Sequence, residues 1–147
     1  MRLADFHYGG GATYFVTVCT HRRSHVLAKV EAVGAVLTPL GLVIQRQWHA
    51  ITTRDAAIHL DELVIMPDHL HGILEFGPST RVRLPRIMAW FKGTSLIASR
   101  EQGLWDQTAL WQRGYYERVI RNQREMDQIR AYIQTNPIRW SLKRGNP

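Results

Sequence analysis

The stretch covering residues 60–76 constrains the fold more than any other part of the chain. It contains two short apolar runs separated by Pro67-Asp68, a pair of residues typical of a tight turn. This pattern predicts two antiparallel strands joined as a hairpin. Because side chains alternate across a strand, His69 and His71 should share one face, while the apolar residues between and after them enter the core.

Two histidines on one face of a strand are a natural partial site for a divalent cation. The same spacing also occurs by chance, and two ordinary hydrogen-bonded histidines remain an alternative at this point. A structural zinc site is disfavoured, because Cys19 is the only cysteine in the sequence and supplies no pair of thiolates.

The length of 147 residues predicts a single domain over residues 1–147. The sequence contains no run of about 18 apolar residues, as a membrane span requires. Its first residues lack the apolar core and cleavage site of a signal peptide. A single cysteine fits a protein of the reducing cytoplasm. We therefore expect a cytoplasmic protein with one hydrophobic core.

The charge is distributed unevenly along the chain, whose formal net charge is +7. Residues 1–80 carry six Lys and Arg against seven Asp and Glu, whereas residues 81–147 carry thirteen against five. Arginine dominates the second half and is interspersed with tyrosine and tryptophan. Arginine binds phosphate and aromatic rings stack on unpaired bases, so this half favours nucleic-acid binding. A solvated basic face with aromatic residues in the core is the alternative.

The remaining elements follow from hydrophobic periodicity. A β-branched and aromatic run over residues 14–20 predicts a first strand, and residues 30–51 have a helical period that Pro39 and Gly41 should kink or split. A second helix is expected over residues 84–99, burying Ile87, Trp90 or Phe91, Leu96 and Ile97 and exposing Arg86 and Lys92. Residues 110–120 should form a fourth strand, with a turn near Gly114.

A last helix is the best defined of these elements. Asn122 followed by Glu125 forms a capping box, and Pro137 disfavours helical geometry at Asn136. A helix is therefore expected to end near Thr135. The order β-α-β-β-α-β followed by a helix predicts an α+β fold. It is a ferredoxin-like split βαβ sandwich with an antiparallel sheet and an added C-terminal helix.

Four segments, in this order, carry a resemblance to a known family. They are Tyr14-Phe-Val-Thr-Val, Val64-Ile-Met-Pro-Asp-His-Leu-His-Gly-Ile-Leu, Leu110-Trp-Gln-Arg-Gly-Tyr-Tyr-Glu-Arg-Val-Ile-Arg-Asn and Tyr132-Ile-Gln-Thr-Asn-Pro. With the helices between them, they span nearly the whole chain. The sequence resembles the single-tyrosine HUH transposases and, more narrowly, the REP-associated tyrosine transposases of bacteria.

The resemblance implies the chemistry of the site. His69, His71 and Asn136 would bind Mg²⁺ or Mn²⁺, and Tyr132 would be the catalytic nucleophile that forms a 5′-phosphotyrosine with DNA. The implied substrate is single-stranded DNA with hairpins like those of REP elements, and the implied location is the nucleoid of a bacterial cytoplasm. Whether the protein acts as a monomer or as a homodimer stays open.

Several alternatives also stay open. Tyr115 or Tyr116 could be the nucleophile instead, and the protein could be a replication or conjugation initiator that nicks single strands. A catalytically silent DNA- or RNA-binding module of the same fold is a third possibility. Basic and aromatic side chains are the candidates for contact with DNA: Arg22, Arg23, Arg83, Arg86, Lys92, Arg113, Tyr115, Arg118 and Arg121.

Overall fold

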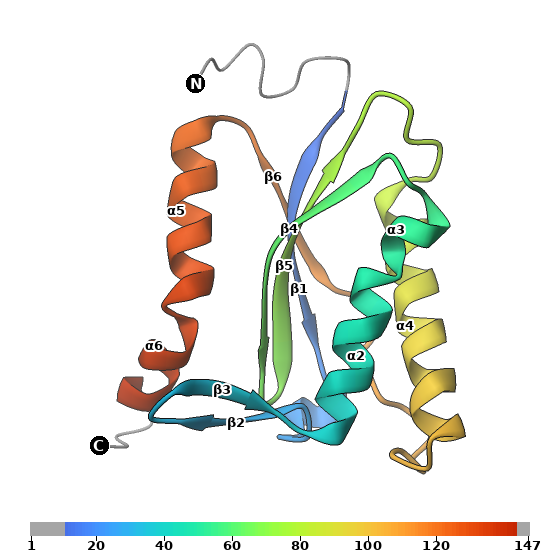
Figure 1. Cartoon of the computed structure of the whole chain (residues 1–147), viewed down its shortest axis with the longest axis vertical. Coiled ribbons are helices and arrows are strands. Elements are labelled where there is room, and N and C mark those ends of the chain that lie inside the picture. Colours follow the sequence, from blue (N-terminus) through green and yellow to red (C-terminus); the bar gives the residue numbers. More distant parts are fainter. Residues whose placement is uncertain (1–10, 144–147) are drawn as a thin grey trace.

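A four-stranded antiparallel sheet forms the centre of the structure (Figure 1). The structure is a computed structural model that describes residues 11–143; the amino-terminal residues, on which the expectation of no signal peptide rests, lie outside the described residues. The strand order is β4-β5-β1-β6. The strands are β1 (Thr13–Cys19), β4 (Ile58–Met66), β5 (His69–Phe76) and β6 (Tyr116–Ile120).

Helices cover both faces of this sheet. Helices α2 (Pro39–His49), α3 (Ile51–Arg54) and α4 (Leu84–Glu101) lie on one side, and α5 (Gln123–Gln134) lies on the other (Figure 1). Leu70 and Leu74 of β5 belong to the larger core beneath α2 and α4. Ile73, which points the opposite way, packs in a smaller core with residues of α5. The predicted ferredoxin-like arrangement is confirmed, and so is the single-residue alternation along β5.

The hairpin predicted around Pro67-Asp68 is confirmed. Strands β4 and β5 pair on either side of this turn, with Met66 opposite His69. On its other edge β5 pairs with β1, which sets Cys19 opposite His69 and Thr17 opposite His71. The two histidines therefore share the face of the sheet that α5 partly covers, and they lie close to the turn.

The prediction of a helix over residues 30–51 is wrong in its first half. A hairpin of β2 (Ala28–Glu31) and β3 (Gly34–Leu37) occupies this region, with a positive φ of 115° at Gly34 that an L side chain rarely adopts. Helix α2 starts only after Thr38, whose side-chain oxygen accepts a hydrogen bond from the backbone of Gly41 at 3.0 Å. Pro39 therefore occupies the first turn of a new helix, where a missing N–H costs little, and does not kink a longer one.

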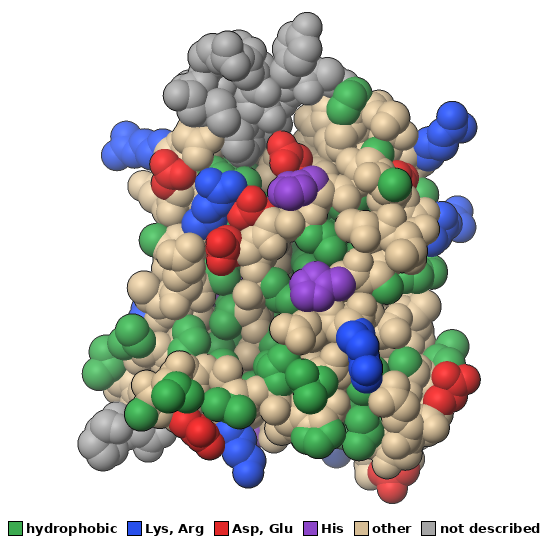
Figure 2. Space-filling view, in the orientation of Figure 1, with side chains coloured by type: hydrophobic (Ala, Val, Ile, Leu, Met, Phe, Trp, Pro, Cys, Tyr) green, Lys and Arg blue, Asp and Glu red, His purple; other side chains and the backbone are tan. Residues whose placement is uncertain are grey.

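This hairpin forms one end of the molecule. It runs across the end of the sheet near the turn between β4 and β5 (Figure 1). Figure 2 shows hydrophobic side chains gathered along this edge of the surface, and Val33 is 86% exposed. Val33 therefore lies in the turn between two short strands, while Val36 lies in β3.

Three further predictions need correction. The fourth strand is shorter than expected, because a turn with φ of 77° at Gly114 delays its start until Tyr116. Ile97 of α4 is exposed and not buried, and Ser95 and Ser99 line the core side of that part of the helix. Lys92 is half-buried rather than exposed, while Arg86 is exposed as predicted.

The chain continues beyond Pro137 as another helix, α6 (Asn136–Lys143), which the sequence reasoning did not anticipate. Pro137 was expected to end helical structure. It lies instead in the first turn of the next helix, a position that tolerates proline. None of the helices described between residues 11 and 143 is long and apolar enough to cross a membrane.

Candidate active site

The residues singled out by the sequence meet in one pocket. It has a volume of about 850 Å³ and lies where β1 and β5 approach the junction of α5 and α6. His69, His71, Tyr132 and Asn136 all line it. Residues separated by more than sixty positions in the sequence are thus brought together as predicted.

The two histidines are held by hydrogen bonds on the same ring atom. Their ring centroids lie 4.6 Å apart. Asp68 Oδ1 lies 2.6 Å from Nδ1 of His69, and Thr17 Oγ1 lies 2.7 Å from Nδ1 of His71. A carboxylate can only accept, so His69 donates from Nδ1 and keeps its lone pair on Nε2. His71 does the same in the tautomer that donates to Thr17. This arrangement is typical of histidines that bind a metal through Nε2.

Burial and nearby positive charge favour a neutral ring at His71. Burial, together with the nearby charges of His69 and Arg139, lowers the pKa of His71 to about 3. Burial acts to raise the pKa of Asp68, but hydrogen bonds from His69 and Arg23 outweigh it and lower that pKa to about 2. Arg23 Nε lies 3.0 Å from Asp68 Oδ2. Asp68 is therefore an ionised group that orients His69, and His71 is neutral, as a metal ligand must be.

Tyr132 lies in the last turn of α5, beside the histidines. Its ring centroid is 5.3 Å from that of His71, at an interplanar angle of 65°. It is 43% exposed, so an incoming group can reach it from the pocket. The guanidinium carbon of Arg139, in α6, lies 4.1 Å above the ring, and the same side chain donates hydrogen bonds to the backbone oxygen of Tyr132 and to Thr135 Oγ1.

Asn136 completes the candidate set of ligands. It is the first residue of α6, it is buried, and it follows the end of α5 closely enough to line the same pocket. Between residues 11 and 143, no group of three or more His, Cys, Asp or Glu side chains could hold a metal ion. In the candidate ligand set, the amide oxygen of Asn136 would be the third protein ligand beside the two histidines. Two imidazoles and an amide oxygen fit an ion such as Mn²⁺ or Mg²⁺ that keeps several other positions for oxygen ligands.

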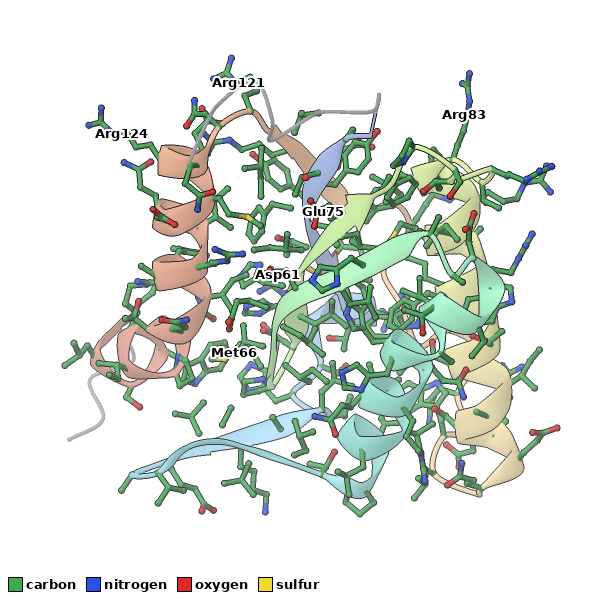
Figure 3. All side chains as sticks on the ribbon, turned by 45° about the horizontal axis from the view of Figure 1, so that its top comes forward. Asp61, Met66, Glu75, Arg83, Arg121 and Arg124 are labelled. Atoms are coloured by element: carbon green, nitrogen blue, oxygen red, sulfur yellow. The ribbon has the colours of Figure 1, made fainter. Side chains whose placement is uncertain are left out.

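The candidate DNA-contacting residues do not all surround this pocket. Arg23 lines it, and Arg113 and Tyr115 line a smaller neighbouring pocket. Arg83 and Arg121 point outward at the end of the molecule opposite Met66, the residue that precedes the turn to His69 (Figure 3). They therefore belong to a different part of the surface.

The other candidates have identifiable surroundings. Arg86 shares a surface pocket with Arg83, and Arg22 is exposed with a positive φ of 56°. The Lys92 ammonium donates to the backbone oxygens of Gln112 and Gly114, so it stabilises a loop. Arg118 is half-exposed and lies 3.9 Å from a carboxylate oxygen of Glu125.

Three side chains in or beside the pocket were missed or left unsupported by sequence reasoning. The position of Asp68 directly before the first histidine could have indicated a contact between the two. The hydrogen bond from His69 to Asp68 nevertheless depends on the geometry of the turn. Thr17 becomes a neighbour of His71 only through strand pairing. Arg139 lies in α6, which was not predicted, so nothing in the sequence pattern pointed to it.

Comparisons with known proteins identify the family of this chain. Residues 11–136 match the family model described as "Transposase IS200 like". An uncharacterized protein of Haemophilus influenzae is 30% identical over 161 residues, which cover 95% of this chain and 88% of that protein.

Two solved structures share the fold. One is a REP-associated tyrosine transposase bound to a REP hairpin, with a TM-score of 0.65 and 22% identity, covering 87% of this chain and 67% of that one. The other is a candidate transposase of Deinococcus radiodurans R1, with a TM-score of 0.55 and 22% identity, covering 85% and 90%. The chain therefore belongs to the IS200-like transposase family, and its fold is that of a REP-associated tyrosine transposase.

Proposed function

We propose that this protein is a metal-dependent endonuclease and strand transferase for single-stranded DNA, that it cleaves beside hairpins, and that Tyr132 is its nucleophile. The observation that carries the proposal is the meeting of Tyr132 with His69, His71 and Asn136 in one pocket, with the rings of His71 and Tyr132 at 5.3 Å. Neither Tyr115 nor Tyr116 lines that pocket.

The chemistry is a displacement at phosphorus. The phenol oxygen of Tyr132 forms a bond to the phosphorus of a phosphodiester and its proton passes to solvent, while the bond to the 3′-oxygen breaks. That oxygen takes up a proton and leaves as a free 3′-hydroxyl, and the other fragment stays attached as a 5′-phosphotyrosine. The step conserves a phosphoester bond, so attack by a 3′-hydroxyl reverses it and joins strands without a nucleotide cofactor.

Different residues of the pocket would bind the metal ion, orient its ligands and bind the phosphate. His69, His71 and Asn136 would hold Mg²⁺ or Mn²⁺, which when bound supplies positive charge to the phosphate oxygens. Asp68 and Thr17 fix the histidine rings through Nδ1. Arg23 and Arg139, both at the pocket, add positive charge where a phosphate would lie.

The proposed substrate is single-stranded DNA joined to a hairpin, bound mainly by residues 81–147. The positive charge of those residues supports this choice, and a protein of the same fold was solved with a REP hairpin bound. Because ionic contacts supply most of such affinity, binding should weaken steeply with rising salt concentration.

The test is formation of a covalent adduct. Labelled hairpin oligonucleotides with randomised single-stranded flanks are incubated with the full chain and Mn²⁺ or Mg²⁺, and adducts are isolated on denaturing gels and mapped by peptide sequencing. We expect modification of Tyr132, and none in Tyr132→Phe, which keeps the packing of the ring. Tyr115→Phe and Tyr116→Phe serve as matched controls and should still form the adduct.

Three results would overturn the proposal. An adduct on Tyr115 or Tyr116 would show that the nucleophile does not lie on α5. Undiminished cleavage in excess chelator would show that the reaction does not need a metal ion. Binding of hairpin DNA without any adduct would identify a silent binding module instead.

A further inference from the structure

A second pocket adjoins the active site. It has a volume of about 320 Å³ and shares Thr17 and Cys19 with the pocket that holds Tyr132. Its other wall is the segment from Gln112 to Tyr116, which leads into β6. Because the two pockets share Thr17 and Cys19 of β1, they lie side by side across the face of the sheet, and we refer to the two together as the groove.

Strand register puts three side chains in a row along this groove. Thr17 of β1 pairs with His71 of β5 on one side and with Tyr116 of β6 on the other. Directly paired residues of antiparallel strands point to the same face, and neighbouring strands are roughly 5 Å apart. Tyr116 is therefore on the same face as His71, at a distance of about two strand spacings or roughly 10 Å.

Helix α5 leaves this part of the face uncovered. It is tied toward the opposite edge of the sheet by an ion pair between Arg130 and Asp61 of β4, with Nη2 2.7 Å from Oδ2. Strand β6 leads into α5 at one end and diverges from it toward the other (Figure 1). Tyr116 lies at the diverging end and is 59% exposed.

Hydrogen bonds from Lys92 of α4 and to Cys19 of β1 fix the wall of the second pocket. The Lys92 ammonium donates hydrogen bonds to the backbone oxygens of Gln112, at 2.9 Å, and of Gly114. The backbone N–H of Gln112 in turn donates to Cys19 O at 2.9 Å. Gly114 has φ of 77°, which a residue with a side chain would adopt only under strain. The groove is thus preorganised and does not need to fold around a ligand.

An exposed tyrosine and a basic side chain thus lie in one open groove beside Tyr132. We propose that Tyr116 is the stacking platform for a base beside the phosphodiester that Tyr132 attacks, and that Arg113 neutralises the adjoining phosphate. An exposed ring beside a basic side chain in an open groove is the arrangement that binds single strands. The inference rests on the function proposed above and adds the path of the strand, from Tyr132 across Thr17 to β6.

Tyr115, the residue before Tyr116, has a different environment. Tyr115 is half-buried against the larger core. Burial and the charge of Glu117 raise the pKa of Tyr115 to about 12. The proposal therefore places the base on Tyr116, while the sequence-based prediction that Tyr115 contacts DNA stays a prediction.

The experiment compares two probes. One is a fluorescent hairpin with a single-stranded thymidine flank, and the other is the same hairpin with a flank of abasic nucleotides, which keeps every phosphate. Affinities for the full chain are measured by fluorescence anisotropy at one salt concentration. The wild-type protein should bind the thymidine flank roughly 5- to 150-fold more tightly, the range expected for stacking of one base.

Variants assign that preference to one ring. Tyr116→Ala should lose most of it while keeping the affinity for the abasic probe, and Tyr116→Phe should retain it. Ile97→Ala removes an apolar side chain of matched exposure on α4, 57% against 59%, and should change neither affinity. Tyr132→Phe should also keep the preference, which separates this test from that of the catalytic tyrosine.

Three results would overturn the inference. They are an absence of preference in the wild-type protein, a preference that survives in Tyr116→Ala, and an equal loss of affinity for both probes in that variant. Failure of the proposed function has a different signature, which is the persistence of the covalent adduct in Tyr132→Phe or its absence in the wild-type protein.

Discussion

The ion pair between Asp61 and Arg130 should determine how firmly α5 is attached to the sheet. Arg130 Nε lies 2.9 Å from Oδ1 and Nη2 lies 2.7 Å from Oδ2, so the pair is bidentate. Asp61→Asn keeps the shape but turns an amide nitrogen toward a guanidinium donor. Hydrogen bonds to charged groups contribute about 1.5–3 kcal/mol. Arg130 is 35% exposed, and solvent screening reduces the expected loss to about 1–2 kcal/mol.

The assay is urea unfolding of the full chain, followed by the fluorescence of its buried tryptophans. Asp127→Asn is the matched control, because Asp127 faces the same arginine at 3.9 Å but is 64% exposed. That change should cost less than about 0.5 kcal/mol. A double-mutant cycle of Asp61→Asn with Arg130→Met should give a coupling of about 1 kcal/mol. Equal effects of the two aspartate changes, or a coupling near zero, would refute the reasoning.

The same pair predicts a dependence on pH. The hydrogen bond from Arg130 outweighs burial and lowers the pKa of Asp61 in the folded protein. A lowered folded-state pKa means that the unfolded chain binds the proton more readily. The stabilisation is therefore complete above the ordinary pKa of aspartate, about 4, and is lost as the pH falls through the lowered value. The difference in unfolding free energy between wild type and Asp61→Asn should shrink over that range.

Three further predictions concern other parts of the structure. Gly72→Ala would put a methyl group 2.3 Å from the buried ring of Trp48, so it should lower the unfolding free energy by about 1–3 kcal/mol in urea titrations. Asn122→Ala removes the cap of α5, whose Oδ1 accepts from a backbone N–H at 2.9 Å, and should cost about 1 kcal/mol by the same method. His71→Ala should abolish Mn²⁺ binding in calorimetry and adduct formation on gels, while affinity for hairpin DNA stays within a few-fold.

The sequence predicted the parts of the fold that depend on local chemistry. The turn at Pro67-Asp68 and the start of α5 at Asn122 each rest on a few neighbouring residues, and both were found as expected. The segment over residues 30–51 was ambiguous, because its apolar residues have helical spacing although Val30 and Val36 lie in two short strands. The positive φ at Gly34 and the cap at Thr38 settle the matter in favour of strands followed by a helix.

In the candidate site too, features that depend on neighbouring residues were predictable, and features that depend on long-range pairing were not. The shared face of His69 and His71 follows from alternation along one strand, so it was predictable from the spacing alone. The contact of Thr17 with His71 depends on the register between two strands, which no local pattern encodes. Arg139 was missed because a proline was taken as the end of helical structure, whereas it also suits the first turn of the next helix.

The proposed catalytic groups come from two parts of the molecule that are attached independently. The histidines belong to β5, a central strand paired on both edges, so their positions are fixed by backbone hydrogen bonds. Tyr132 belongs to α5, which meets the sheet through a small apolar core and the pair of Arg130 with Asp61. Arg130 lies half a turn before Tyr132, so we expect loosening of this pair to displace the proposed nucleophile relative to the histidines. A loss of adduct formation in Asp61→Asn that exceeds its loss of stability would be the sign of that displacement, because misplacing a reacting group by about 1 Å costs roughly 100-fold in rate.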